Sequence, residues 1–235
     1  MTSRTFSEAE VFEITKNVIL SAQLPPGTKL PETRIAPLFG ITRERLQKVF
    51  HRLGNDQLLD VKTNRGTAIP VPSLELAREL FEARRTLEVG IGIRLAERLN
   101  KVDIARLREH LELEKKVASE QARPDFIVTS SNFHILLSEL LNNSLITKQL
   151  EALIAKSALF STFHDPNNVS ACACAEHQLI VDALENGSIA DVCHAIVSHL
   201  SLIETRLTLT TRSFEKADPE AVFSEFIQKY AQPAL

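Results

Sequence analysis

The pattern of apolar residues changes abruptly at Pro70 and Pro72, and this change constrains the possible fold more than any other feature of the chain. Before the two prolines, short amphipathic segments alternate with turn residues. After them, apolar residues recur at helical spacing with almost no strand signal. We therefore predict a mainly α-helical protein with a small domain over residues 1–70, a larger all-helical domain over residues 73–212, and a helical tail over residues 213–235.

The small domain is predicted to contain three short helices followed by a β-hairpin. The expected elements, in order, are a helix between Ser7 and Pro25, a helix within 32–39, a helix that begins at Thr42, and β-prone segments over 57–61 and 67–71. Pro37 falls inside the second helix, where a proline costs about 3 kcal/mol, so we expect that helix to start late or bend. This order of elements is typical of a winged helix-turn-helix.

The larger domain is predicted to be an antiparallel helical bundle. Its helices are expected at about 74–99, 103–120, 125–141, 145–160, 170–186 and 188–210. Short connections between successive helices favour antiparallel neighbours. A last amphipathic helix should begin at Asp218-Pro219-Glu220, and we expect it to pack on the bundle or on a partner subunit.

Charge is distributed unevenly between the two domains. Residues 1–70 carry 10 Lys or Arg against 7 Asp or Glu, whereas the other 165 residues carry 17 against 23. A basic domain beside an acidic one suits a protein that meets phosphates with one part only.

Cysteine usage and apolar run lengths favour a protein of the cytoplasm. The three cysteines, Cys172, Cys174 and Cys193, are an odd number, which favours free thiols in a reducing compartment. No apolar run approaches the roughly 20 residues that span a bilayer, and the first residues do not resemble a signal peptide. We expect no membrane partner.

The segment that begins at Thr42 offers polar side chains on the first turn of a helix, the part of a recognition helix that reaches base edges. Arg43 could bind guanine through two hydrogen bonds or clamp a phosphate, and Gln47 could contact an adenine edge. Thr42 could donate to a phosphate. Arg65, at the tip of the expected hairpin, suits a phosphate or a narrow minor groove. The alternative is that Arg43 and Arg45 are simply solvated surface residues.

Five segments of the small domain together resemble the GntR family of regulators, in order and in spacing. They are LPPGTKLPE (24–32), IA (35–36), GITR (40–43), RL (52–53) and RGTAI (65–69). The resemblance implies that DNA recognition is carried by Thr42, Arg43, Gln47, Arg65 and Gly66.

This sequence departs from the GntR pattern in the recognition helix. Family members usually have Ser or Thr and then Pro where Glu44 and Arg45 stand here, and Arg where Gln47 stands. Glu44 repels phosphate but can accept from a cytosine amino group, so it can sharpen specificity while it weakens affinity. We therefore count Glu44 and Arg45 among the DNA-binding residues and expect an uncommon operator.

Three histidines, His134, His177 and His199, lie on separate predicted helices of the larger domain, and His177 and His199 are on apolar faces. A single histidine on such a face is most often a hydrogen-bonded core residue. Neutral imidazoles from separate helices can also converge on one transition metal. The residues alone leave both interpretations open.

The larger domain also resembles the FCD ligand-binding domain found in many FadR-type GntR regulators. The matching pieces are RxxLE (84–88), FH (133–134), Asn143, EHxxIxxALxxG (176–187) and HL (199–200). In such domains an Asp and three His bind a divalent metal that helps to hold a small carboxylate effector. The resemblance implies that His134, His177 and His199 are metal ligands and that Arg84 and Asn143 line the effector pocket.

The aspartate of the FCD pattern is absent, because Ser130 stands one helical turn before His134. Three neutral nitrogens hold a hard cation poorly, so the site should prefer zinc, nickel or copper. The carboxylate of the effector could complete the ligand shell, and we place Ser130 among the effector-binding residues. Alternatively, Cys174 could contribute a thiolate, although a small buried hydrophobe is the commoner role of such a cysteine.

These observations predict a homodimeric transcription repressor that binds a palindromic DNA operator and releases it when a small organic acid binds. A second class, a metal-dependent helical enzyme, has only the histidines in its favour. The chain has no nucleophile elbow, no phosphate loop and no separated pair of catalytic carboxylates. A third class is a DNA-binding dimer whose bundle binds no metal, which Ser130 favours.

Overall fold

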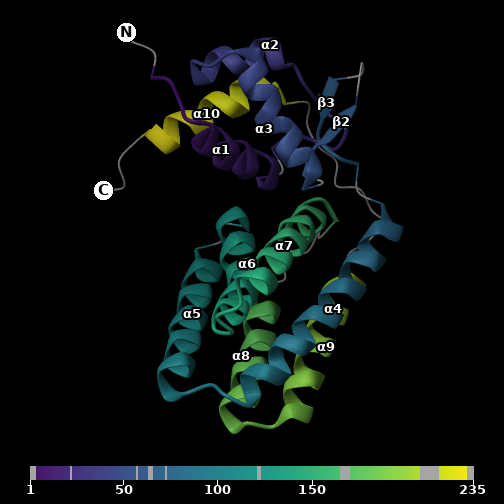
Figure 1. Cartoon of the computed structure of the whole chain (residues 1–235), viewed down its shortest axis with the longest axis vertical. Coiled ribbons are helices and arrows are strands. Elements are labelled where there is room, and N and C mark those ends of the chain that lie inside the picture. Colours follow the sequence, from purple (N-terminus) through teal and green to yellow (C-terminus); the bar gives the residue numbers. More distant parts are fainter. Residues whose placement is uncertain are drawn as a thin grey trace. The chain divides into compact units, whose positions relative to one another are not determined.

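The computed structural model describes residues 4–21, 23–56, 58–62, 66–71, 73–120, 123–164, 170–206 and 217–231. Two compact units are present: Met1–Pro72 with Arg212–Leu235, and Ser73–Thr211. The predicted mainly helical fold is confirmed (Figure 1). Within the described ranges, no helix combines the length and apolar character needed to cross a membrane.

The first unit contains a three-helix core, a small sheet and the last helix of the chain. Its elements are α1 (Glu8–Leu20), β1 (Lys29–Leu30), α2 (Glu32–Ile35), η1 (Ala36–Phe39), α3 (Arg43–Asn55), β2 (Asp60–Lys62), β3 (Gly66–Ala68) and α10 (Pro219–Ala231). The strands β2 and β3 form the predicted hairpin, although they are shorter than expected. The strand β1 was not predicted, because two residues are too few to show a period-two pattern. It pairs with β3, so the sheet order is β1-β3-β2.

Local side-chain contacts explain where the helices of this unit begin. The hydroxyl of Ser7 accepts from the backbone N–H of Glu10, whose carboxylate accepts from the backbone of Ser7, so the predicted capping box is present. Thr42 caps α3 by accepting from the backbone N–H of Arg45. Pro37 lies near the start of the 3₁₀ helix η1, so the predicted bend takes the form of an α-helical turn followed by a tighter one.

Helix α10 packs against α1, α2 and η1, which corrects the expectation that it would cover the bundle or a partner subunit. The ring of Phe223 is fully buried and meets the ring of Phe39 edge to face, with centroids 5.9 Å apart. Phe39 in turn meets Phe6 at 5.8 Å. The apolar face that the sequence shows on α10 is therefore covered by the helices of its own unit.

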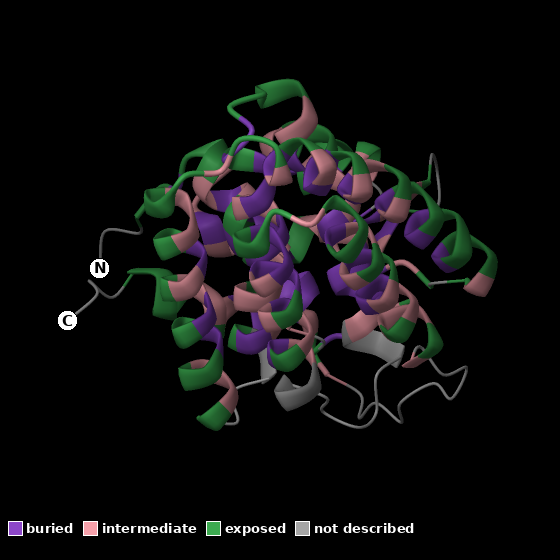
Figure 2. Ribbon diagram, turned by 90° about the horizontal axis from the view of Figure 1, so that it is seen from below, coloured by how far each residue is buried: buried purple, intermediate pink, exposed green. Residues whose placement is uncertain are grey.

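The second unit is the predicted helical bundle. Its helices are α4 (Leu74–Ala96), α5 (Lys101–Ser119), α6 (Arg123–Glu139), α7 (Ser144–His164), α8 (Ser170–Asn186) and α9 (Ile189–Arg206). Neighbouring contacts run in the closed order α4-α9-α8-α5-α6-α7 and back to α4. Buried positions face the inside of the bundle and exposed positions face outward (Figure 2). The interior of the bundle is mostly apolar, and it also encloses several polar side chains.

Candidate functional site

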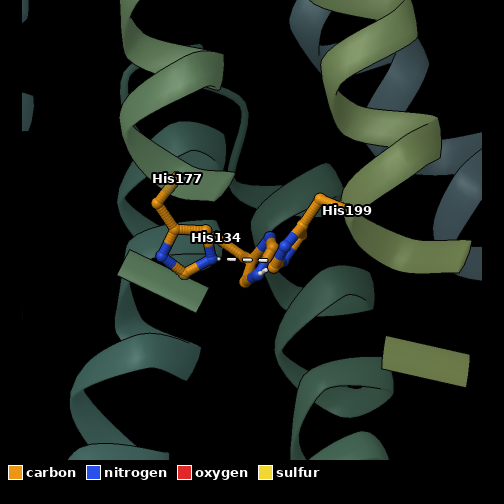
Figure 3. Close-up of side chains that lie close together, drawn as sticks. All are labelled: His134, His177 and His199. Atoms are coloured by element: carbon orange, nitrogen blue, oxygen red, sulfur yellow. Dashed lines mark hydrogen bonds between the residues drawn. The ribbon is translucent and has the colours of Figure 1, made fainter. Parts of the chain in front are cut away.

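The side chains of His134, His177 and His199 meet inside the bundle, although they come from α6, α8 and α9 (Figure 3). Each is buried, with at most 3% of its surface exposed. The Nε2 atom of His199 lies 3.1 Å from Nε2 of His177 and 3.2 Å from Nε2 of His134. The predicted convergence of the three histidines is therefore present, with their Nε2 atoms turned toward one point.

A glutamate holds the other ring nitrogen of each histidine. The Nδ1 atom of His134 lies 2.6 Å from Glu88 Oε2, and that of His199 lies 2.8 Å from Glu176 Oε2. His177 Nδ1 lies 2.9 Å from both carboxylate oxygens of Glu114. These glutamates lie on α4, α8 and α5, so the arrangement involves five of the helices in the described bundle. Such partners orient metal-binding imidazoles and make them more basic.

The three carboxylates decide where the imidazole protons lie. An ionised carboxylate can only accept a hydrogen bond, so each Nδ1 must carry the proton and donate it. In the neutral ring, Nε2 is then an acceptor with an exposed lone pair. His199 Nε2 lies about 3 Å from each of the other two Nε2 atoms, and acceptors placed in this way cannot satisfy one another. A cation at this point, either a metal ion or a proton shared between rings, would satisfy these acceptors.

The surroundings disfavour the protonated forms of His134 and His199. Burial lowers the pKa of His134 to about 4, although Glu88 opposes the shift. Burial also lowers the pKa of His199 well below its usual range, and the neighbouring His177 and His134 rings add to this. Neutral imidazoles at physiological pH are the form that binds a transition metal.

Two arginines balance the buried carboxylates. Arg84 Nε donates to Glu88 Oε1 at 2.7 Å, and Arg206 donates to Glu176. Burial alone would raise the pKa of Glu88, but Arg84 and His134 outweigh it and lower the pKa to about 2. The Nη2 atom of Arg84 is buried and has no hydrogen-bond partner. A buried cationic donor without a partner is costly, so this atom is suited to receive an anionic ligand.

The other residues expected near the metal are placed differently. Ser130 is half-buried on α6, one helical turn before His134. Asn143 is exposed, and its amide oxygen accepts from the backbone N–H groups of Leu145 and Ile146 at the start of α7. It therefore has a local role as a helix cap.

The thiol of Cys174 does not join the candidate ligand group of the described chain. Burial raises the pKa of this thiol to about 11, and Glu114 adds to the shift, so the protonated form persists. The structure thus favours the small buried hydrophobe over the thiolate ligand. The side chain of Cys172 lies outside the described residues.

A separate hollow of about 660 Å³ lies on the surface of the bundle between α4 and the start of α7. Its lining includes Leu87, Gly90, Arg94 and Ile146, but none of the three histidines. The chemistry needed to hold a small anion is concentrated at the histidines and Arg84. We therefore place the candidate ligand site there.

The first turn of α3 is open to solvent, as a DNA-contacting turn must be. Thr42, Arg43 and Glu44 are exposed, and Gln47 is half-buried. Hydrogen bonds from its own backbone N–H and from Thr42 lower the pKa of Glu44, so it is an anion at neutral pH. Gly66, at the start of β3, is exposed and has a φ of 78°, which suits the turn of a wing. Arg65 lies outside the described residues.

Two acidic residues from neighbouring helices contact the cations of this turn. Glu32, the first residue of α2, accepts from Arg43 and Gln47. Arg45 instead pairs with Glu8 across 3.6 Å, and about half of each of these side chains is open to solvent.

Sequence reasoning missed the glutamates that hold the histidines. Glu88 and Glu176 lie within motifs that carry the resemblance to the FCD domain, which was a usable signal. The sequence contains no such signal for Glu114, because this residue lies 63 positions before His177 in an ordinary run of charged residues. Glu32 was noted only as part of the GntR pattern.

Comparisons with known protein families match both units. Residues 8–69 match the family described as bacterial regulatory proteins, gntR family. Residues 79–202 match the FCD domain, which by itself is more than half of the chain.

Individual proteins give the same result at low identity. The chain is 26% identical to the Uxu operon regulator of Haemophilus influenzae, over 83% of this chain and 77% of that protein. It is 23% identical to the HTH-type transcriptional repressor RspR of Escherichia coli, over 62% of this chain. The match spans 64% of the length of RspR.

A solved structure shares the fold. A putative transcriptional regulator GntR from Rhodococcus sp. RHA1 superposes with a TM-score of 0.77 at 21% identity, over 87% of this chain and 99% of that one.

Proposed function

The chain belongs to the GntR family of bacterial regulatory proteins and carries an FCD domain, and from this premise we propose that it is a metal-dependent, ligand-controlled transcription repressor. In this proposal a homodimer in the cytoplasm binds a palindromic operator through α3 and the wing. A small organic acid binds at the histidine cluster and weakens operator binding. The observation that carries the sensing function is the meeting of three Nε2 acceptors at one buried point.

Exposed polar groups on a capped helix support the DNA-binding part. The N-terminal turn of α3 presents Thr42, Arg43 and Gln47 from a helix whose other face is anchored by buried apolar residues. A turn held in this way can enter a major groove without rearrangement. The wing residues Arg65 and Gly66 and the flanking Glu44 and Arg45 complete the proposed interface.

The donor set fits a borderline transition metal. His134, His177 and His199 would hold the ion through Nε2, while Glu88, Glu114 and Glu176 keep the three rings in the required tautomer. Three imidazoles with no carboxylate favour zinc, nickel or copper over magnesium or calcium. When bound, the metal supplies positive charge and open coordination positions for a carboxylate.

The proposed effector is a small carboxylate. The Nη2 atom of Arg84 offers a buried hydrogen bond, and the charge of Arg84 reaches both His134 and His199, whose pKa values it lowers. A carboxylate there would satisfy Nη2 and complete the metal shell that lacks the family's aspartate. Ser130, half-buried on α6, and Asn143 remain candidates for the rest of the ligand's polar groups.

The chain passes between the two units near residues 72 and 211, and the histidine cluster is tied to the helices next to both crossings. Glu88 lies on α4, which follows the first crossing, and contacts His134. Arg206 ends α9 before the second crossing and binds Glu176, the partner of His199. Ligand binding that shifts these contacts therefore acts on α4 and α9, the helices nearest to the two crossings.

Selection from random duplex DNA tests the DNA-binding part. The wild-type protein should enrich a palindromic sequence, and Arg43→Ala should bind that sequence about 5- to 150-fold more weakly, the range expected for a good arginine contact. Arg52→Ala, an exposed cation on the same helix, is the matched control and should retain most of the affinity. Equal losses in both variants would contradict the assignment of the recognition turn.

Metal analysis tests the sensing part. Protein stripped with a chelator and incubated with zinc should retain about one ion per chain, as tested by elemental analysis of the dialysed protein. His177→Ala should retain much less, while His194→Ala, an exposed histidine on α9, should behave as the wild type. Full occupancy in His177→Ala would exclude the site.

Effector binding is tested on the zinc-loaded protein with a panel of small carboxylic acids. An acid that raises the melting temperature should also weaken binding to the selected duplex. Turnover of the acid would instead support an enzyme. An absence of zinc binding and of any response to acids would support a DNA-binding dimer without a sensor.

A further inference from the structure

We infer that Glu32 is a specificity-determining positioning residue of the DNA interface, which sets the hydrogen-bonding groups that Arg43 and Gln47 present to base edges. The inference rests on the proposed DNA binding by α3. Glu32 lies on α2, outside the recognition helix, and its own side chain need not touch DNA.

One carboxylate joins three parts of the DNA-binding unit. Glu32 Oε2 accepts from Arg43 Nε at 3.1 Å and from Gln47 Nε2 at 2.7 Å. Glu32 Oε1 accepts from Thr67 Oγ1 at 3.2 Å. Only 11% of the Glu32 side chain is exposed, and Thr67, on β3, is buried. The carboxylate thus links α2, the first two turns of α3 and the sheet that carries the wing.

The contact with Arg43 orients its guanidinium. Glu32 binds Nε, which leaves the two Nη groups out of this hydrogen bond. The Nη groups at the far end of the guanidinium can make two parallel hydrogen bonds to guanine O6 and N7. An arginine held by its Nε loses less side-chain entropy when it binds, and a wrong base cannot be accommodated by swinging the side chain away.

The contact with Gln47 decides which way its amide faces. A carboxylate accepts hydrogen bonds and cannot donate, so the NH₂ group of Gln47 must face Glu32. The amide oxygen is then turned away from Glu32 and can accept from a base amino group. Without the carboxylate, the amide could rotate and exchange its donor and acceptor, and Gln47 would no longer distinguish base edges that differ in this respect.

The neighbouring pair, Arg45 and Glu8, shows the contrast. Its two charged atoms are 3.6 Å apart, and 40% of the Arg45 side chain and 51% of the Glu8 side chain are exposed. Water competes for such a pair, so it contributes little rigidity. Glu8 therefore supplies a matched control, since it is also a carboxylate beside an arginine of the first turn of α3.

The negative charge of Glu32 has an opposite effect on general affinity. It neutralises part of the attraction between Arg43 and phosphates, which is independent of sequence. Removing the charge should therefore weaken discrimination while leaving binding to unrelated DNA unchanged or stronger. A residue that only stabilised the fold would lower both affinities together.

The test compares the variants Glu32→Gln and Glu8→Gln in the full-length protein. The probes are the duplex that the wild type selects from a random pool, its single-base variants, and an unrelated duplex of the same length. Discrimination is measured as the ratio of the affinity for the selected duplex to the affinity for a single-base variant. At the positions contacted by Arg43 and Gln47, Glu32→Gln should lower this ratio about tenfold. Glu8→Gln should keep the wild-type ratio.

A coupled variant separates positioning from folding. In an Arg43→Ala background, Glu32→Gln should cause no further loss of discrimination at the base that Arg43 contacts. If Glu32→Gln melts far below the wild type, Glu32→Asp takes its place, because it keeps the charge but cannot reach Arg43 and Thr67 together. Wild-type discrimination in the folded variant would overturn the inference. If the wild type itself selects no sequence, the proposed DNA binding fails instead.

Discussion

Replacing Phe223 with alanine should destabilise the DNA-binding unit and leave the bundle unchanged. The ring is fully buried on α10 and packs edge to face on Phe39. Loss of a buried phenylalanine costs about 3–5 kcal/mol, of which the aromatic contact contributes about 0.5–1.5 kcal/mol. The free energy of unfolding of a small domain is only about 5–15 kcal/mol, so this loss is a large fraction of the total.

Hydrogen exchange resolved by mass spectrometry can assign the effect to one unit. Phe223→Ala should increase exchange in α1 and α3, which share a core with α10, while α4 to α9 keep their protection. Operator affinity should fall because fewer molecules have a folded DNA-binding unit.

Phe226 provides the matched control, since it lies on the same helix, is only half-buried, and stacks under Lys229. Phe226→Ala should cost roughly 1 kcal/mol. Equal effects of the two variants, or loss of protection in the bundle, would refute the assignment of α10 to the DNA-binding unit.

Three further predictions concern the bundle. Burial lowers the pKa of His134 from 6.5 to about 4, so between these pH values the unfolded chain binds a proton that the folded chain excludes. The free energy of unfolding should therefore fall as the pH drops, by about 2 kcal/mol between pH 7 and 5. Urea unfolding of metal-free protein measures this, and His134→Gln should flatten the profile; an equally steep profile in that variant would contradict the cause. Glu114→Gln should weaken zinc binding about 10- to 100-fold in a chelator competition, because the carboxylate makes His177 more basic. An unchanged zinc affinity would argue against this role of Glu114. Gly92→Ala should lower the free energy of unfolding by about 1–3 kcal/mol, since a Cβ there would lie 2.5 Å from a side-chain atom of α9. A Cβ at Gly90 meets no atom within 4 Å, so Gly90→Ala should be neutral or stabilising by up to about 1 kcal/mol. Equal shifts of the melting temperature in the two variants would refute this packing argument.

The sequence alone predicted the features that depend on neighbours along the chain. The capping hydroxyls of Ser7 and Thr42, the bend at Pro37 and the succession of bundle helices follow from residues three or four positions apart. The inward orientation of His177 and His199 follows from the same helical period. Their convergence on one point was implied by the resemblance to the FCD domain and is confirmed by the structure.

The tertiary structure alone decided which distant groups became partners. The carboxylates that hold His134 and His177 lie 46 and 63 residues earlier in the chain than these histidines. The carboxylate of Glu32 accepts hydrogen bonds from side chains that lie 11, 15 and 35 positions after it in the sequence. The apolar face of α10 was visible in the sequence, but the surface that covers it was not. Helical periodicity determines which face of a helix is buried, whereas the pairing of faces depends on how all the helices fill one core, and a local pattern does not contain that information.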